Sequence, residues 1–316
     1  MEELTNIKLD WNVILGKQIR TLQEQFSGID AVKLFSPIVD ILSRNMVPSR
    51  VIISGGQVSA YSYVLPSGVL DDRIICTIGF MKDTDDNTEK GETILKWLDE
   101  MSVGSGKLII IDNMFNGSFL YGTLEKYGYK LDRRLKMKST LKNITGKSND
   151  SMLSGESASD MNILKVNDVK IEEMRSAQYD AYGDSPEHYL LYLKDRKNLT
   201  YDILLDGYYG KFMPSPSCVL YKNGVAGACI ITDGKEEFIN TGVPLIVDIF
   251  VKKEFRDRGF SYAMIRHAAE KLEMLGHEEM QLWVNEASKA RNIYQDIGFA
   301  DTGEAETLYW KDFRKS

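Results

Sequence analysis

One unit of the sequence constrains the fold more than any other: an apolar strand joined by a short glycine loop to an amphipathic helix. Residues 246–251 are almost continuously β-branched or aromatic, which is typical of a strand covered on both faces. Gly259 follows in a polar loop, and from Ser261 onward apolar residues recur at helical spacing. The first turn of a helix leaves backbone N–H groups unpaired at the positive end of the helix dipole. The loop therefore predicts an anion site, with Arg256 and Arg258 as added counter-charges.

A second strand and helix follow directly. Residues 280–284 predict a strand, and the polar residues Asn285 and Ser288 lead into a helix that carries Tyr294. The pair Gly298-Phe299 then marks the end of the helix and the return of the chain to a strand. Two strand–helix pairs in this order are a more specific signal than one such pair alone.

Together these segments resemble a known family. The motif Arg256-x-x-Gly259-x-Ser261, followed by the segment 285–299, looks like the acyl-CoA-binding core of the GCN5-related N-acetyltransferase (GNAT) family. The family pattern usually ends in Gly or Ala, whereas this chain has Ser261, which is still small enough to allow a close approach of the backbone to a pyrophosphate. The segment 218–231 resembles the preceding hairpin, so the resemblance covers roughly the last half of the chain.

The resemblance implies acetyl-CoA as the co-substrate. Backbone groups of Ile249 and Val251 would pair with the pantetheine arm, amides at 258–261 would hold the pyrophosphate, and Asn285 would orient the pantetheine amides. For Asn285 an ordinary helix cap is the alternative. The predicted acetyl-CoA-binding residues are Ile249, Phe250, Val251, Arg256, Asp257, Arg258, Gly259, Phe260, Ser261, Asn285 and Ser288.

The resemblance also implies direct attack of an amine on the thioester, with Tyr294 as the general acid for the leaving thiolate. A phenol, with an ordinary pKa of about 10, can protonate a thiolate whose conjugate acid lies near 8.5. The alternative is a helix tyrosine that packs against Phe299. In the family the general base is often a carboxylate near this strand, and Asp248, which lies inside the strand beside the expected position of the thioester, is the leading candidate. Burial between Val247 and Ile249 would raise its pKa, which suits a base, and an aspartate exposed at a strand bend is the alternative.

Three histidines are further candidates for the base, namely His188, His267 and His277. His188 lies in a tyrosine-rich segment, 179–209, which occupies the region that helps to form the acceptor site in the family. Two helices packed on the sheet are the alternative explanation of this segment.

The first half of the chain shows a similar order of elements. It contains a predicted hairpin at 50–65, strands at 73–80, 107–111 and 135–141, a helix at 91–101, and the segment 124–129, which parallels 294–299. The sequence therefore predicts an α/β fold with an α+β mixed sheet, made of two tandem GNAT-like domains. Each is expected to be a mixed, largely antiparallel twisted sheet flanked by helices, at 1–145 and 163–316, with a Ser/Gly/Asn-rich linker at 146–162.

The first copy is predicted to be degenerate. Leu124 takes the place of Tyr294, and Thr88 takes the place of Arg256. Its expected pyrophosphate loop retains Gly91 but carries the acidic residues Asp83, Asp85, Asp86 and Glu89. Like-charge repulsion opposes CoA binding there, so we expect the first domain to support the second.

Composition narrows the function further. The chain has 316 residues and a formal net charge of −7, which argues against a general nucleic-acid binder and favours a cationic acceptor, a small-molecule or peptide amine. Cys76, Cys218 and Cys229 are scattered and, with the histidines, show no ligand spacing, so no metal is predicted. No signal segment or membrane span is predicted, and we expect a cytoplasmic monomer or homodimer without a membrane partner.

One different class of function stays open. A catalytically inactive acyl-CoA-binding or protein-interaction module would have the same fold, with Tyr294 and Asp248 as structural residues only. A dinucleotide enzyme is excluded because no G-x-G-x-x-G motif opens the chain.

Overall fold

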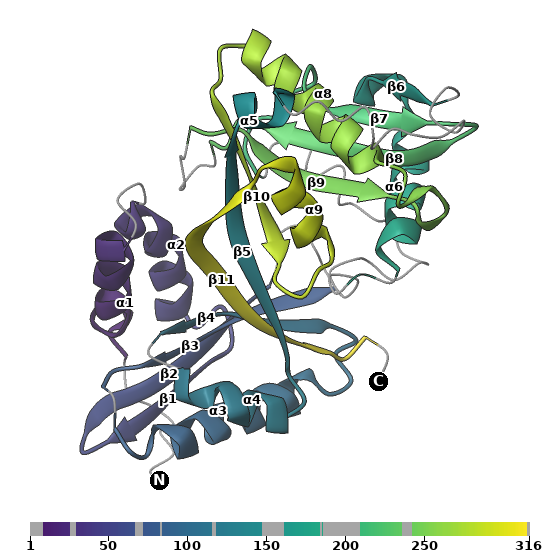
Figure 1. Cartoon of the computed structure of the whole chain (residues 1–316). Helices are drawn as coiled ribbons and strands as arrows, with labels where there is room; N and C mark the ends of the chain where they lie inside the picture. Colours follow the sequence, from purple (N-terminus) through teal and green to yellow (C-terminus); the bar gives the residue numbers. More distant parts are fainter. Residues whose placement is uncertain are drawn as a thin grey trace. The chain divides into compact units, whose positions relative to one another are not determined.

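The chain forms two compact units of mixed sheet and helix (Figure 1). The computed structural model describes residues 9–25, 30–66, 72–82, 84–115, 118–146, 161–183, 185, 209–235 and 242–314. Unit 1 comprises Met1–Asp132 together with Thr307–Ser316, and unit 2 comprises Arg133–Glu306. The predicted linker at 146–162 lies outside the described residues except for its first residue and its last two.

Unit 1 is a mixed sheet with a helical layer on each face. Its elements in chain order are α1 (Trp11–Gln25), α2 (Ala31–Ser43), β1 (Ser49–Ser54), β2 (Gln57–Pro66), β3 (Arg73–Phe80), α3 (Asn87–Ser102), β4 (Leu108–Phe115), the 3-10 turn η1 (Ser118–Leu120), α4 (Tyr121–Lys126) and the start of β5 (Lys130–Thr140). Strands β1, β2 and β3 pair antiparallel, and β4 lies parallel to β3 through the crossover helix α3. The last part of β11 (Ala300–Asp312) pairs antiparallel with β4.

Unit 2 repeats this pairing pattern. Its remaining elements are α5 (Leu141–Thr145), β6 (Asn162–Leu164), η2 (Val166–Asp168), α6 (Ile171–Tyr182), β7 (Cys218–Tyr221), β8 (Val225–Thr232), β9 (Leu245–Val251), η4 (Lys253–Phe255), α8 (Phe260–Met274), β10 (Glu279–Asn285) and α9 (Ala290–Ile297). Strands β6 to β9 pair antiparallel, β10 lies parallel to β9 through the crossover helix α8, and β5 pairs antiparallel with β10. The predicted mixed α/β class is confirmed.

Each sheet has two apolar faces with separate cores. In unit 2, α5, α8 and α9 pack on one face of the sheet, and α6 packs on the opposite face. In unit 1 α3 and α4 cover one face, and the helices α1 and α2 cover the other. Trp11 of α1 packs edge-on against Tyr61 and Tyr63 of β2, with ring centroids 6.4 Å apart in both pairs.

The last strand of each half of the sequence pairs within the other unit. β5 follows the elements of unit 1, yet residues 134–140 pair with β10 of unit 2. β11 follows the elements of unit 2, yet residues 309–312 pair with β4 of unit 1. The compact units therefore divide at residues 132 and 306, whereas the sequence predicts a boundary near 150. Alternating apolar residues identify a strand and its buried face, but they do not select which open strand edge it joins.

Buried charges hold the end of the chain in unit 1. The guanidinium of Arg314 contacts the carboxylate of Asp72 at 2.9 Å, and the same carboxylate contacts Arg73 at 3.1 Å. Three residues before Arg314, the ammonium of Lys311 lies 2.6 Å from the carboxylate of Asp99 on α3. Each charge is paired, which is the condition under which a buried charge is tolerated.

Gly91 allows α3 to pack closely on η1, and its replacement tests this packing. A Cβ atom at this position would lie 2.1 Å from Cδ2 of the fully buried Leu120. We expect Gly91→Ala to lower the free energy of unfolding by about 1–3 kcal/mol through overpacking. The matched control is Gly16→Ala in α1, where a Cβ atom meets nothing within 4 Å; it should stabilise the protein by about 0.5–1 kcal/mol. Urea denaturation of both variants measures the free energy of unfolding. Equal changes in the two variants would show that the structure accommodates a Cβ atom at position 91.

Candidate functional site

The parallel strands of unit 2 part soon after they meet. The ladder between β9 and β10 contains two residue pairs, Leu245 with Gln281 and Ile246 with Leu282. β9 continues to Val251, paired along its other edge with β8. The equivalent strands of unit 1, β3 and β4, stay paired over seven positions. Unit 2 therefore presents an edge of β9 that an extended ligand can join as an added strand, while in unit 1 that edge is closed.

A β-bulge lies where the strands part. The register between β8 and β9 shifts between Ile230 and Ile231, so Val247 is the extra residue of β9. After the bulge, Ile249 and Val251 pack on the α8 face, while Phe250 packs on the α6 face. Asp248 also lies on the α6 face, where its carboxylate contacts α6. The predicted strand residues thus alternate between the two faces beside the opening.

The predicted pyrophosphate loop ends in the long helix α8, as expected from the sequence. Two of its residues have left-handed backbone, Asp257 at φ 61° and Gly259 at φ 76°. Gly259 is the N-cap of α8, and the first intrahelical bond runs from the amide of Ala263 to its carbonyl. The first amides of a helix have no acceptor within the helix, so the start of α8 places amide donors at the positive end of a helix dipole. The guanidinium of Arg258 lies over the ring of Phe255, 5.9 Å from its centroid.

The side chain of Arg256 makes contacts that the sequence did not predict. Its Nε donates to the carbonyl of Val251 at 3.1 Å, and its Nη2 donates to the carbonyl of Ala181 at the end of α6. The guanidinium therefore ties the loop to the end of β9 and to α6. The predicted role as a counter-charge stays a prediction.

Asp248 is buried and hydrogen-bonded by α6. Only 6 % of the residue is exposed. Nε2 of Gln178 donates to Oδ2 at 2.9 Å, and the hydroxyl of Tyr182 donates to Oδ1 at 2.7 Å. Burial is the main reason that the pKa of the Cys229 thiol on β8 is raised, and the neighbouring Cys218 and Asp248 raise it further. The carboxylate lies inside the sheet and not at an exposed bend.

Tyr294 lies on the opposite face of the sheet, in the core formed with α8. It is 7 % exposed, and its ring packs edge-on against Phe299 with centroids 6.1 Å apart. This is the contact expected from the packing alternative, and a role as the acid requires in addition that its hydroxyl reach the sulfur. Oδ1 of Asn285 accepts from the amide of Ala287 at 2.8 Å, and Oγ of Ser288 accepts from the amide of Ala290 at 3.3 Å. Both side chains therefore shape the turn that leads into α9.

Of the three candidate histidines, the structure describes two. His267 lies in the middle of α8, and His277 follows that helix; both are partly buried. His188 lies outside the described residues, as do Tyr189, Tyr192, Tyr201 and Tyr208 of the tyrosine-rich segment. Gln178 and Tyr182 are the functional candidates that the sequence analysis missed as partners of Asp248. Their spacing of four residues, which places both on one helix face, was the signal available.

In unit 1 the loop that corresponds to the pyrophosphate loop is filled by its own side chains. Nζ of Lys90, a buried side chain, donates to Asp86 at 2.6 Å and to the hydroxyl of Thr84 at 3.2 Å. Asn87 donates to the carbonyl of Lys82 at 2.8 Å. Leu124, in the place of Tyr294, is fully buried. The loss of the ligand site in the first copy stays a prediction.

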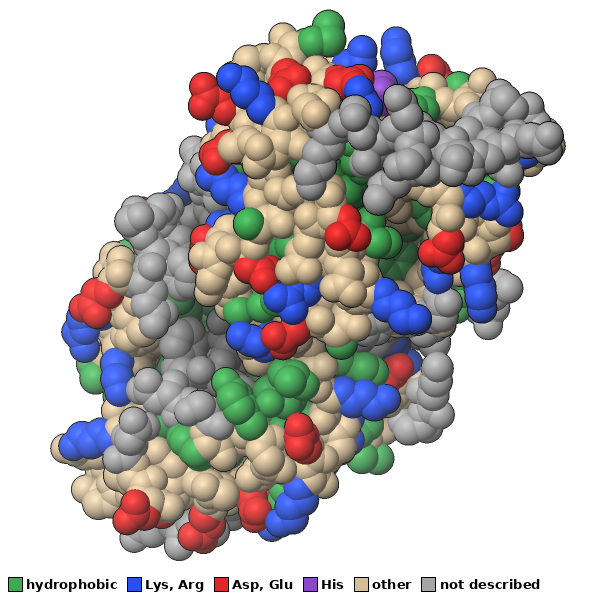
Figure 2. Space-filling model, in the orientation of Figure 1, with side chains coloured by type: hydrophobic (Ala, Val, Ile, Leu, Met, Phe, Trp, Pro, Cys, Tyr) green, Lys and Arg blue, Asp and Glu red, His purple; other side chains and the backbone are tan. Residues whose placement is uncertain are grey.

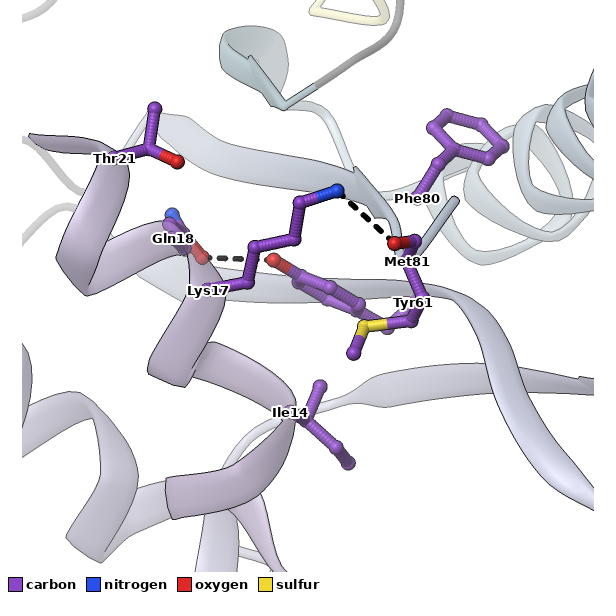
Figure 3. Close-up of a pocket in the computed structure, with 7 residues that line it drawn as sticks. All are labelled: Ile14, Lys17, Gln18, Thr21, Tyr61, Phe80 and Met81. Atoms are coloured by element: carbon purple, nitrogen blue, oxygen red, sulfur yellow. Dashed lines mark hydrogen bonds between the residues drawn. The ribbon is translucent and has the colours of Figure 1, made fainter. Parts of the chain in front are cut away.

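A shallow pocket in unit 1 lies between α1 and the ends of β2 and β3 (Figure 3). The hydroxyl of Tyr61 donates to Oε1 of Gln18 at 2.9 Å, and Nζ of Lys17 donates to the carbonyl of Met81 at 3.0 Å. Nε2 of Gln18 has no partner among the described residues. The space between these side chains suits about one water molecule, which is the simplest partner for this amide.

The described part of the chain holds no cluster of three or more His, Cys, Asp or Glu side chains arranged to bind a metal ion. Within the same residues, no helix combines the length and apolar character needed to cross a membrane. On the face shown in Figure 2, acidic and basic side chains are interspersed.

Comparison with known proteins identifies the class of the C-terminal domain. The family model described as an acetyltransferase (GNAT) domain matches residues 219–308, from β7 into β11. This range includes the parted strands, the loop before α8 and Tyr294. The chain therefore carries a domain of the GNAT family, and the class of reaction on this fold is acyl transfer. A search of curated proteins found no match.

Solved structures share the fold at low sequence identity. A GCN5-related N-acetyltransferase from Sphaerobacter thermophilus is 14% identical with a TM-score of 0.51, and the match covers 88% of this chain and 86% of that one. A fungal multi-domain GH3 β-N-acetylglucosaminidase with a GCN5-related glucosamine N-acetyltransferase region is 13% identical with a TM-score of 0.53. That match covers 98% of this chain and 38% of the longer fungal chain. At these identities the likeness shows the fold alone.

The environment of His267 predicts a pH dependence of stability. Burial, followed by the nearby Lys271, lowers the pKa of His267, and Glu270 opposes this shift. The unfolded chain, with an ordinary histidine pKa of about 6.5, then binds a proton more readily than the folded state. The contribution to stability is complete above pH ~6.5 and is lost as the pH falls from there toward the lower folded pKa.

We therefore expect the free energy of unfolding to fall more steeply below pH ~6.5 in the wild type than in His267→Gln. Urea denaturation over a series of pH values measures this slope. His277→Gln, which removes a histidine just beyond the same helix, is the control. Parallel curves for the wild type and His267→Gln would contradict the assignment.

Proposed function

We propose that unit 2 transfers an acetyl group from acetyl-CoA to a primary amine of a small molecule or peptide. The observation that carries the proposal is the parting of β9 from β10 beside the loop that opens α8. The parted edge of β9 suits the extended pantetheine arm, which carries amides that can pair with a strand. The amides at the start of α8 suit the pyrophosphate, and Arg256 holds that loop against the end of β9.

The residues present fit this co-substrate. Gly259 has a left-handed backbone and no side chain to obstruct the loop, and small Ser261 follows in the first turn of α8. The amide of Lys252 donates to Ala226 of β8, so by alternation the backbone groups of Ile249 and Val251 point to the other edge of β9, where the Val251 carbonyl accepts from Arg256. The thioester of acetyl-CoA would supply the acyl group, and Tyr294 would donate a proton to the departing thiolate.

An amine acceptor agrees with the net charge of −7, because an acidic protein attracts cations. The name of the fungal region, a glucosamine N-acetyltransferase, adds an amino sugar to the acceptors worth testing. The buried free thiols Cys76, Cys218 and Cys229 support a reducing, cytoplasmic location. The packing of Tyr294 on Phe299 supports the alternative, an inactive acyl-CoA-binding or interaction module.

Calorimetric titration with acetyl-CoA tests the site. We expect one binding site per chain, lost in Gly259→Glu, because a carboxylate at the loop repels the pyrophosphate and its side chain obstructs it. Gly276→Glu is the matched control: it also replaces a glycine with left-handed backbone, at φ 84°, next to the other end of α8. Binding that survives in Gly259→Glu would refute the loop assignment, and two sites per chain would show that unit 1 also binds.

Tyr294→Phe tests the proposed acid. The substitution keeps the ring on Phe299 and removes the hydroxyl, so we expect turnover to fall by about 10²-fold or more with the affinity for acetyl-CoA unchanged. Release of the CoA thiol in the presence of glucosamine, spermidine and an Nα-blocked lysine measures turnover. Equal turnover of the wild type and the variant would leave Tyr294 with a packing role only.

A further inference from the structure

Asp248 and α6 form a compact polar unit inside unit 2. The carboxylate is 6 % exposed, whereas Tyr182, which donates to its Oδ1 at 2.7 Å, is only partly buried. Gln178, one helical turn earlier, is 2 % exposed and donates to Oδ2 at 2.9 Å. Because both donors lie on one face of α6, the helix sets the orientation of the carboxylate. Tyr182 is therefore the more exposed residue of the pair.

From this geometry we infer that Tyr182 is the group that receives the acceptor's proton, and that Asp248 is its final base. The inference rests on the proposed amine acetyltransferase function. A primary amine is largely protonated near neutral pH and must lose a proton before its nitrogen can attack a carbonyl. Asp248 by itself, buried under α6, is poorly placed to remove that proton. The phenol of Tyr182 provides the connection between the acceptor and the carboxylate.

The proton transfer balances without any further reactant. One N–H bond of the ammonium breaks, and a new O–H bond forms at the Tyr182 oxygen. The original O–H bond of Tyr182 breaks, and its proton moves to Oδ1 of Asp248. The net result is a neutral amine and a protonated Asp248, with Tyr182 unchanged. The distance of 2.7 Å between the two oxygens is within the range for direct proton transfer along a hydrogen bond.

The pair lies on the correct side of the sheet for such a role. Tyr182 and Asp248 are on the α6 face of β9, whereas Tyr294 belongs to the core on the α8 face. Residue 248 comes just after the point where β9 leaves β10. The acceptor would therefore lose its proton on one face of the opening, and the thiolate would gain one on the other. Different residues would therefore accept the proton of the amine and donate a proton to the thiolate.

Titratable or charged groups lie near the carboxylate on α6, on β8 and after β9. On α6, Tyr182 is the titratable group in contact, and Gln178 is neutral. On β8, burial above all, with Cys218 and Asp248 as smaller causes, raises the pKa of the Cys229 thiol, so this thiol is neutral near pH 7. After β9, the guanidinium of Arg256 bonds to the carbonyl of Ala181, the residue before Tyr182. This contact holds the end of α6 next to the carboxylate.

Two conservative variants separate proton transfer from structure. Tyr182→Phe keeps the ring but removes the hydroxyl. Asp248→Asn keeps the shape and can still accept from Tyr182, while the Gln178 amide can turn to accept from the new NH₂ group; it cannot take up a proton. Tyr221→Phe is the matched control, because Tyr221 is also partly buried and packs on the same core.

The experiment measures acetyl transfer to glucosamine, spermidine and an Nα-blocked lysine from pH ~7 to pH ~9.5, with acetyl-CoA affinity measured by calorimetry. Near pH 7 we expect kcat/KM for the amine to fall about 10²-fold in Tyr182→Phe and Asp248→Asn, with unchanged affinity for acetyl-CoA and no loss in Tyr221→Phe. The deficit should shrink to within about threefold as the pH approaches the pKa of the amine, because the neutral amine then needs no base.

A deficit that stays constant with pH would show a purely structural role and overturn the inference, as would full activity of both variants near pH 7. If the wild type binds acetyl-CoA but releases no thiol with any of the amines, the proposed acetyltransferase function fails, and the relay fails with it. Loss of the relay alone is therefore distinguishable from loss of the function.

Discussion

The structure of unit 2 depends on the parting of two parallel strands. β9 and β10 share two residue pairs and then separate, at the place where a bulge adds Val247 to β9. Parallel strands that stay paired satisfy each other's backbone groups and leave no room for a ligand, which is the state of β3 and β4 in unit 1. Within the described residues no strand pairs with this edge of β9 after Ile246, so an extended chain or ligand can pair there.

The bulge also determines which side chains flank the opening. Because it shifts the alternation of β9 by one residue, Val247 and Asp248 both face α6, while Ile249 and Val251 face α8. A carboxylate then enters an otherwise apolar layer, where burial without partners would be costly. Gln178 and Tyr182 supply the hydrogen bonds that offset this cost, and Arg256 adds a contact from the loop to the same end of α6. These contacts connect β9, the loop before α8 and the end of α6.

The sequence predicted the elements of this site better than it predicted their contacts. The strand, the loop and the helix at 246–275 are local features, and they recur in the structure as β9, the Gly259 turn and α8. The strands predicted at 73–80, 107–111 and 135–141 likewise recur in β3, β4 and β5. In contrast, the sequence did not predict that the guanidinium of Arg256 donates to the backbone carbonyls of Val251 and Ala181. Such a choice depends on neighbours that are 75 residues apart in the chain.

The sequence by itself determined the local conformations: where strands and helices form, where glycine permits a left-handed turn, and where a helix start offers free amides. These follow from side-chain size, branching and spacing within a few residues. Only the tertiary structure decided that β5 joins β10 and β11 joins β4, that β9 parts from β10, and that Asp248 pairs with α6. These outcomes depend on competition between distant partners for the same strand edge or the same carboxylate, and no local pattern records the result of that competition.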